Sequence, residues 1–411
     1  MPLCRKAIQK LYLPDFLYLC GMNEQKRNGF KTTLSGLLTL AEQGVDRVKN
    51  RKWGKNMPPS PLEIIAYTGY GTPEHLYCRG RILQSKGIVT SAKDSPWRNL
   101  LNTYHRFESD EVPHHPLQIH YGGNTFVLQT NEEGYFKLDA ALPTALQPSN
   151  NIWHNARFDL PATAANIQQH QMVSAYSQML VPNHLADYGV ISDLDDTLIK
   201  SNIISKTKML YLALFKNAYT RLAFRGAPAL YWAFRKGKNG NSKNPIFYVS
   251  NSPWNLYDML DEFMDINHIP KGPILLRDFG HAGNDELSAA FKQHKYNETV
   301  KILQTYPNLP FILIGDSGEK DADTYLQVAR QFPGRILCIY IRAVNDKKRA
   351  QRVQQLAKTE TNTTMLLIED SLDIAKHAEL NGFIHKQGLY LVNQSLYSDR
   401  SSLVDFWLEE E

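Results

Sequence analysis

The chain has 411 residues, of which 43% are hydrophobic and 21% are charged, and its formal net charge is +5. This composition is typical of a globular protein with two or three domains and excludes an intrinsically disordered chain. No apolar run reaches the roughly 20 residues that a membrane-spanning helix needs. The four cysteines are scattered without the spacing of a metal site, which predicts a reducing compartment and no disulfide framework.

Residues 1–56 form a basic segment whose excess of positive charge is larger than that of the whole chain. Such a segment predicts an anionic partner, either a membrane or a nucleic acid. Apolar residues between Leu34 and Val48 recur at helical spacing, which predicts an amphipathic helix. This helix could pack on its own domain or lie on a membrane. Gly36 and Gly44 disfavour a free-standing membrane helix. We interpret the short run Leu11–Leu19 as a packing or interfacial contact rather than a secretory signal.

Residues 57–182 have the pattern of a β-rich, sandwich-like domain, which we assign to structure or partner binding. The pair Gly122-Gly123 separates two strands as a hairpin turn would. The expected strands are Leu62–Tyr67, Leu76–Leu83, Leu117–Tyr121, Thr125–Gln129 and Tyr135–Leu138, with further strands after residue 150.

The stretch Tyr188–Leu198 reads as a buried strand that runs into an acidic turn. Asp193, Asp195 and Asp196 follow the apolar part of the strand, and Thr197 closes the turn. Carboxylates this close repel one another, so a cation or a substrate must offset their charge. A few hard oxygen ligands beside a substrate phosphate suit Mg²⁺. The turn alone could also be a solvated acidic loop.

The spacing Asp-x-Asp-x-Thr at a strand end resembles motif I of the haloacid dehalogenase superfamily. In phosphatases of that superfamily the first Asp attacks phosphorus and the second is the general acid and base. The resemblance therefore implies that Asp193 is the nucleophile, that Asp195 is the acid and base, and that Thr197 contributes to phosphate binding. It also implies an α/β fold, a haloacid-dehalogenase-like parallel sheet with helices on both faces and a helical cap insertion.

Two downstream segments match the next motifs of that superfamily. The strand Ile246–Ser250 precedes a helix over 254–264, and a Ser hydroxyl with backbone N–H groups at a helix start can hold phosphate oxygens. Ser250 and Asn251 are thus the predicted phosphate-binding residues. In the third motif, Lys295 is predicted to neutralise charge on the phosphoryl group, although Lys292 and Lys301 are alternatives.

A second acidic turn follows the apolar strand Phe311–Gly315. The resemblance implies that Asp316 binds Mg²⁺ together with the Asp193 carboxylate and the Asp195 backbone carbonyl. Asp321 completes this predicted metal site by orienting Asp316 or Lys295. We expect both acidic turns at the carboxyl edge of one parallel sheet.

The detailed sequence resembles the actin-patch-type phosphatidate phosphatase family over roughly residues 185–345. The family implies Mg²⁺-dependent conversion of phosphatidate to diacylglycerol. We therefore place a phosphatase domain at 183–345, with an extension of helices and strands at 346–411. The segments that carry the resemblance are Tyr248–Tyr257, Gly272–Gly280, His294-Lys295, Ile314–Asp321 and Phe332–Arg335.

The predicted cap, residues 198–245, interleaves basic and aromatic side chains and lacks Asp and Glu. Such a segment favours an anionic bilayer surface, with Arg221, Arg225, Arg235 and Lys236 among the expected contacts. A solvated cap packed by its aromatic residues and a nucleic-acid contact are the alternatives, and the position over motif I makes nucleic acid unlikely.

The sequence thus predicts a cytoplasmic, peripherally membrane-associated phosphatidate phosphatase whose partner is phosphatidate in anionic membranes. The alternatives are a phosphatase of another phosphomonoester and a non-catalytic phosphatidate-binding module. The presence of Asp195 disfavours the hypothesis of a non-catalytic module.

Overall fold

The computed structural model describes residues 61–84, 112–161, 173–194, 225–277, 284–344, 346–360 and 362–397, except for the side chains of Met259 and of residues 284–292. All of the described residues belong to one compact unit, Pro61–Glu411. The basic N-terminal segment, the helix predicted after Leu34, the motif I residues Asp195 and Thr197, and most of the predicted cap lie outside the described residues.

The β-rich region forms one hydrogen-bonded sheet of eight strands rather than the two separate sheets of a sandwich. Buried residues from β3, β4, β6 and β7 share a single hydrophobic cluster, so this sheet curves around its own core. The strands are β1 (Leu62–Ala66), β2 (Gly69–Thr72), β3 (His75–Gln84), β4 (Pro116–Tyr121), β5 (Asn124–Gln129), β6 (Tyr135–Ala141), β7 (Trp153–Asp159) and β8 (Ser174–Leu180).

The hairpin predicted at the two adjacent glycines is present between β4 and β5. Tyr121 pairs with Asn124 across the turn, which leaves only Gly122 and Gly123 between the strands. Both glycines have positive φ values, 54° and 80°, as a tight hairpin turn of this length requires. The register that follows places Leu117 and Ile119 in the core.

The second sheet has six parallel strands in the order β11-β10-β9-β12-β13-β14. Successive strands extend from the central strand β9 first to one side and then to the other, which makes the boundary beside β9 a topological switch point. The strands are β9 (Gly189–Asp193), β10 (Ile246–Pro253), β11 (Ile274–Arg277), β12 (Phe311–Asp316), β13 (Ile336–Arg342) and β14 (Met365–Ile368).

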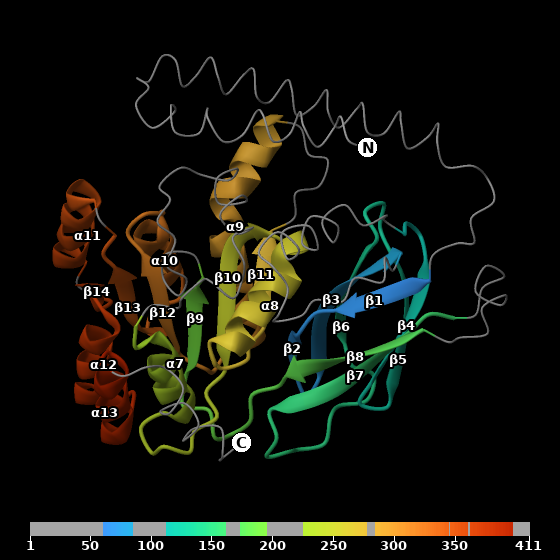
Figure 1. Cartoon of the computed structure of the whole chain (residues 1–411), viewed down its shortest axis with the longest axis horizontal. Coiled ribbons are helices and arrows are strands. Elements are labelled where there is room, and N and C mark those ends of the chain that lie inside the picture. The colour runs from blue at the N-terminus through green and yellow to red at the C-terminus, as the bar shows by residue number, and fades with distance from the viewer. Residues whose placement is uncertain are drawn as a thin grey trace, which may run out of the picture. The chain divides into compact units, whose positions relative to one another are not determined.

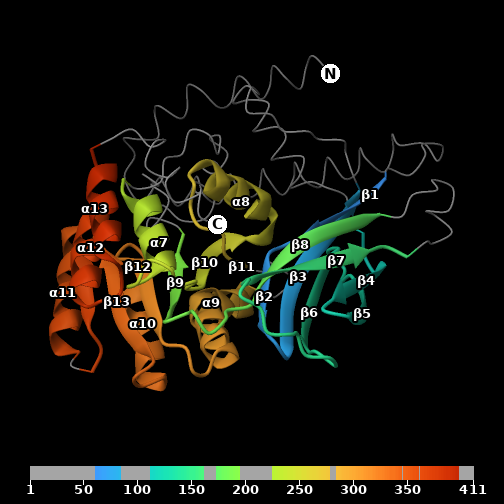
Figure 2. The same cartoon turned by 90° about the horizontal axis from the view of Figure 1, so that it is seen from below.

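Helices cover both faces of the parallel sheet (Figures 1 and 2). Alternate residues of each strand bury toward opposite faces: Val190 belongs to the cluster with α7, α8, α12 and α13, and Ile191 to the cluster with α9, α10 and α11. The helices are α7 (Ala227–Lys236), α8 (Tyr257–Ile266, after the short 3₁₀ turn η2, Trp254–Leu256), α9 (Asn284–Thr305), α10 (Asp321–Gln331), α11 (Lys347–Thr359), α12 (Ser371–Leu380) and α13 (Lys386–Ser395).

Helix α7 corrects part of the cap prediction. Arg235 and Lys236, which the sequence placed on a membrane-facing surface, are only 3% and 8% exposed. The guanidinium group of Arg235 donates to the carbonyl oxygen of Lys271 and lies 5.9 Å from the ring centroid of Trp153. These two cations and the aromatic residues of α7 pack inside the protein, because α7 is one of the helices that cover the sheet. Arg225, in contrast, is exposed.

Candidate active site

Three strand ends with polar side chains meet at the carboxyl edge of the parallel sheet. Asp193 ends the central strand β9, Asp316 ends β12 on one side, and Ser250 lies near the end of β10 on the other. The parallel register pairs Val249 with Asp193, so the polar part of β10 begins level with the end of β9. This edge is the switch point of the sheet, where open α/β folds bind ligands.

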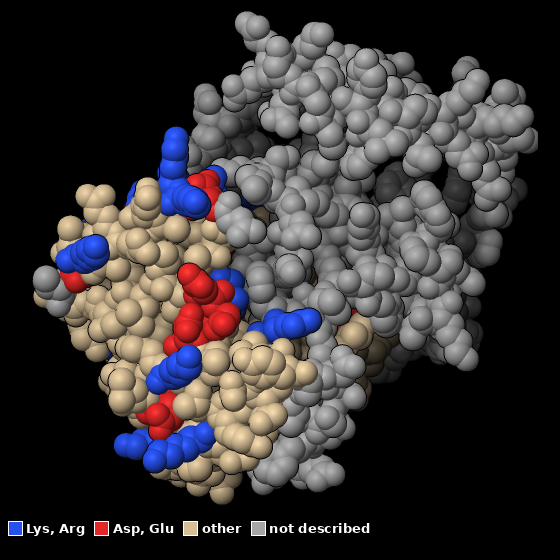
Figure 3. Space-filling view, turned by 60° about the vertical axis from the view of Figure 1, so that its left-hand side comes forward, with Lys and Arg blue, Asp and Glu red and all other residues tan. Residues whose placement is uncertain are grey.

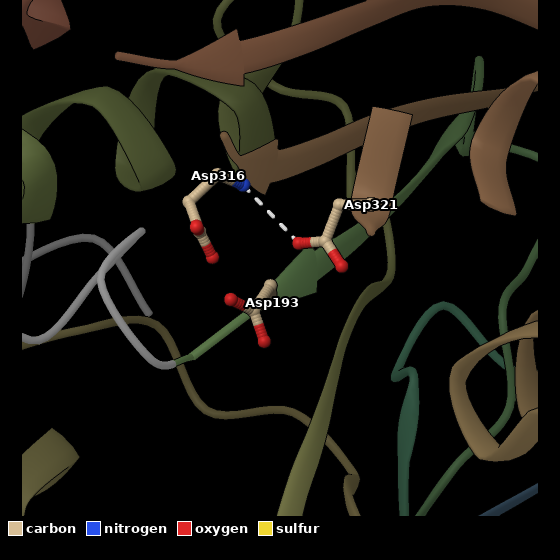
Figure 4. A group of neighbouring side chains, drawn as sticks. All are labelled: Asp193, Asp316 and Asp321. Atoms are coloured by element: carbon tan, nitrogen blue, oxygen red, sulfur yellow. Dashed lines mark hydrogen bonds between the residues drawn. The ribbon is translucent and has the colours of Figure 1, made fainter. Parts of the chain in front are cut away.

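A buried acidic triad forms the centre of the site (Figure 4). It consists of Asp193, Asp316 and Asp321, whose exposed fractions are 0%, 0% and 1%. One carboxylate oxygen of each lies within 4.8 Å of those of the others. Asp321 is the first residue of α10, so the turn between β12 and α10 brings its side chain back over the strand end.

The turn after β12 fixes Asp316 in one orientation. Its Oδ1 atom accepts hydrogen bonds from the backbone N–H groups of Gly318 and, at 3.0 Å, of Glu319. Within the described residues no donor reaches its second oxygen, Oδ2, which is buried in the cluster. A buried carboxylate oxygen without a donor fits a cation ligand.

Asp321 uses both of its oxygens to hold other members of the site. Its Oδ1 atom lies 2.8 Å from Nζ of Lys295, and its Oδ2 atom accepts from the backbone N–H of Asp316 at 3.1 Å. A Cβ atom at Gly315 would come within 2.5 Å of this carboxylate, so the close approach requires glycine. Asp321 therefore contacts both Asp316 and Lys295.

Lys295 is the cation that contacts two members of the acidic triad, Asp193 and Asp321. It lies on α9 with 6% exposure, and its Nζ atom is 2.8 Å from Asp193 Oδ1 and 3.0 Å from Glu319 Oε2. Burial alone would lower the pKa of Lys295, but the surrounding carboxylates, Asp193 first among them, raise it well above its ordinary value. Lys295 therefore remains charged. Of the alternatives, Lys301 instead binds Asp139 in the β-rich region at 2.6 Å.

The acidic side chains have strongly perturbed proton affinities. Burial raises the pKa of Asp193 well above its ordinary value, although Lys295 opposes the change. Burial and the neighbouring Asp321 raise the pKa of Asp316 to about 7. The single ammonium group therefore does not neutralise the cluster, and a divalent cation would complete the compensation. The triad can hold a metal ion.

The phosphate-binding residues predicted on β10 lie beside this cluster. Ser250 is fully buried, and its Oγ atom accepts from the backbone N–H of Ser252 at 2.9 Å. Asn251 donates from Nδ2 to Glu319 Oε2 at 2.8 Å. The structure thus brings Asp193, Asp316, Asp321, Lys295, Ser250 and Asn251 to one sheet edge.

Sequence reasoning missed two residues of the site. Glu319 contacts both Lys295 and Asn251, and Arg277 ends β11 with a 5% exposed side chain. Arg277 could have been predicted as a site residue, because a charged residue directly after the apolar run Ile274–Leu276 marks a strand end. Glu319 gave no such signal, because it stands in an acidic turn where solvated carboxylates are ordinary.

Comparison with known proteins shows what this sheet and its strand ends are similar to. Residues 188–343 match the family described as "Phosphatidate phosphatase APP1, catalytic domain". The chain is 28% identical over 248 residues to phosphatidate phosphatase APP1 of Saccharomyces cerevisiae, covering 58% of this chain and 40% of that protein. It is also 28% identical over 221 residues to an uncharacterized protein of Schizosaccharomyces pombe, covering 53% of this chain and 34% of that protein. The chain thus spans well under half the length of these two relatives.

Among solved structures, a carbohydrate acetylesterase from Xanthomonas citri aligns with 82% of this chain and 75% of its own, at 10% identity and a TM-score of 0.28. A likeness this weak carries no argument about the fold or the site.

Proposed function

We propose that this chain hydrolyses phosphatidate to diacylglycerol and phosphate in a Mg²⁺-dependent reaction, because residues 188–343 match the catalytic-domain family of phosphatidate phosphatase APP1. The observation that carries the proposal is the group of Asp193, Asp316, Asp321 and Lys295 at the switch point of the sheet, inside the matched residues. The order of the strands and the spacing of the motifs support a haloacid-dehalogenase-like fold for this domain.

In the proposed reaction the Asp193 carboxylate attacks phosphorus, and the bond to the diacylglycerol oxygen breaks. Asp195 gives its proton to that oxygen and then takes a proton from the water that hydrolyses the aspartyl phosphate. Lys295, 2.8 Å from Asp193, offsets the negative charge that gathers on the phosphoryl oxygens. Asp321 keeps Lys295 in place through its own contact at 2.8 Å.

The acidic triad fits the proposed cofactor. Carboxylate oxygens are hard ligands, and Oδ2 of Asp316 is buried without a donor among the described residues. Asp193 and Asp316, with the backbone carbonyl of Asp195, would hold the ion. Bound there, Mg²⁺ would supply charge stabilisation at the phosphoryl oxygens and would favour the ionised form of Asp193.

A phosphatidate substrate requires contact with a lipid surface, and we propose a peripheral one. No helix among the described residues is long and apolar enough to cross a membrane. The face in Figure 3 carries basic and acidic side chains next to one another, which disfavours that face as a purely electrostatic membrane contact. Within the predicted cap, Arg225 is exposed and remains a candidate contact.

Phosphate release from phosphatidate vesicles, compared with release from a soluble phosphomonoester, tests the proposal. We expect Mg²⁺-dependent release that favours the vesicles, and none from Asp193→Asn. Equal rates on both substrates would point to a general phosphomonoesterase. Vesicle binding without any release by the parent would indicate a non-catalytic lipid-binding module.

A further inference from the structure

The carboxylate of Glu319 occupies a position among the groups predicted to bind the substrate phosphate. Its Oε2 atom lies 3.0 Å from Nζ of Lys295 and accepts a hydrogen bond from Nδ2 of Asn251 at 2.8 Å. One donor comes from α9 and the other from the end of β10, and the Glu319 side chain itself is 39% exposed. A carboxylate and a phosphate bind to the same kinds of donor.

Arg277 adds a second cationic group to the same part of the site. It pairs in the parallel register with Pro253, at the end of the strand that carries Asn251, and its side chain is 5% exposed. Burial lowers the pKa of Arg277 to about 10, and the charge of Glu319 opposes that change. The charge of Arg277 thus interacts with that of Glu319, and the planar fork of a guanidinium group also matches the oxygens of a phosphate.

Lys295 does not need Glu319 to remain charged or positioned. Asp193 and Asp321 each approach its Nζ atom to 2.8 Å, closer than Glu319 does. The backbone of Glu319 is held by Asp316, through the bond from its N–H to Oδ1. Its long, partly exposed side chain can therefore rotate toward solvent without disturbing the turn that holds Asp316.

We propose that the Glu319 carboxylate occupies the position of the substrate phosphate in the free protein. When Glu319 rotates away, Arg277 binds this phosphate together with Lys295 and Asn251. The inference rests on the proposed phosphomonoester chemistry of this site. It assigns Arg277 as a phosphate-binding residue and Glu319 as an internal competitor of phosphate.

Equilibrium binding of inorganic phosphate tests this without turnover. Titration calorimetry of the full chain in MgCl₂ would compare the parent with Glu319→Ala, Glu319→Gln and the control Asp323→Asn. If Glu319 leaves the site open about 10% of the time, its removal should tighten phosphate binding about 10-fold. Glu319→Gln should act in the same direction, because it removes the charge but keeps a hydrogen-bonding group. Asp323 pairs with Arg352 instead, so its loss should change affinity little.

The Arg277 variants test the second half of the inference. Arg277→Gln should weaken phosphate binding about 10- to 100-fold, the usual worth of hydrogen bonds to a charged group, both in the parent and in the Glu319→Ala background. Arg277→Lys keeps the charge and should lose less phosphate affinity than Arg277→Gln. It replaces the Gln variant in the test if that variant fails to fold. Arg330→Gln, at a 68% exposed arginine on α10, is the matched control.

Unchanged or weaker phosphate binding by Glu319→Ala would overturn the role of Glu319. Parent-like affinity in Arg277→Gln would overturn the role of Arg277, and phosphate binding by none of the proteins would overturn both. An assay of phosphatidate hydrolysis by the parent tests the proposed function separately. If Glu319→Ala binds phosphate more tightly but no phosphatidate is hydrolysed, phosphatidate is not the substrate, and the roles of Glu319 and Arg277 are still supported.

Discussion

Replacing Asp316 with Asn should stabilise the metal-free protein at alkaline pH. Burial and Asp321 raise the pKa of Asp316 from 3.8 to about 7. The folded protein thus binds this proton more tightly than the unfolded chain does, and the free energy of unfolding falls as the pH rises between these values. A pKa about three above the ordinary value lowers the free energy of unfolding by about 4 kcal/mol. The full decrease is present above about pH 7, and none of it is present below about pH 4.

The Asn side chain fits the bonds that the structure shows. Its Oδ1 atom can still accept from the N–H groups of Gly318 and Glu319. Its amide nitrogen replaces Oδ2, the buried oxygen that no described donor reaches, and can donate to a neighbouring carboxylate. In excess chelator at about pH 8, Asp316→Asn should therefore be more stable than the parent by up to about 4 kcal/mol.

Urea unfolding between about pH 5 and about pH 8 measures this difference, with and without Mg²⁺. The stability difference between Asp316→Asn and the parent should decrease as the pH falls, because Asp316 of the parent then becomes protonated. Mg²⁺ at about 100 times its dissociation constant should stabilise the parent by about 2.7 kcal/mol and the variant much less. Asp323→Asn, in the first turn of α10, controls for the loss of one carboxylate outside the acidic triad. A variant less stable than the parent in chelator at about pH 8, or a gain independent of pH, would refute the reasoning.

Four further predictions concern catalysis, the lipid surface and stability. Asp193→Asn should remain folded and release no phosphate, and Asp195→Asn should be slower by roughly 10²- to 10⁴-fold in a phosphate-release assay. Replacing Arg221 and Arg225 with Gln should weaken binding to anionic vesicles by up to about 2 kcal/mol, an effect that salt should mimic, with little change on a soluble phosphomonoester. Arg235→Gln should instead lower the unfolding midpoint and leave vesicle binding unchanged, since Arg235 is buried.

The strands of the parallel sheet were readable from the sequence because each is an apolar run with a distinct end. Phe311–Gly315 was predicted and β12 extends it by one residue, Asp316. The predicted strand at Ile246 likewise matches the start of β10. Strands buried on both faces are continuous in apolar residues, so even a short run is distinctive. The order of the strands in the sheet required the structure.

Helix α7 shows why charge alone predicts exposure poorly. The interleaved cations and aromatic residues at 227–236 resemble an interfacial segment, yet Tyr231 and Phe234 pack onto the sheet. Arg235 is also buried, because its guanidinium group donates to the Lys271 carbonyl and contacts the Trp153 ring. Both partners are distant in the sequence, so no local pattern could have shown them.

Helix α9 links the acidic site to the β-rich region. Lys295 and Lys301 lie on this helix six residues apart, which corresponds to about 9 Å along its axis. Lys301 binds Asp139 of β6 at 2.6 Å and lies 3.5 Å from the ring centroid of Tyr77 on β3.

Two more contacts join the same regions on either side of the site. The hydroxyl of Tyr306, just beyond α9, donates to the carbonyl of Gly71 at 3.0 Å, and Tyr67 stacks on Trp254, which directly follows β10. The β-rich sheet thus contacts both the helix that carries Lys295 and the turn that follows Asn251. Because a shift of Lys295 by about 1 Å would disturb its contacts to three carboxylates, these contacts contribute to the geometry of the site as well as to its stability.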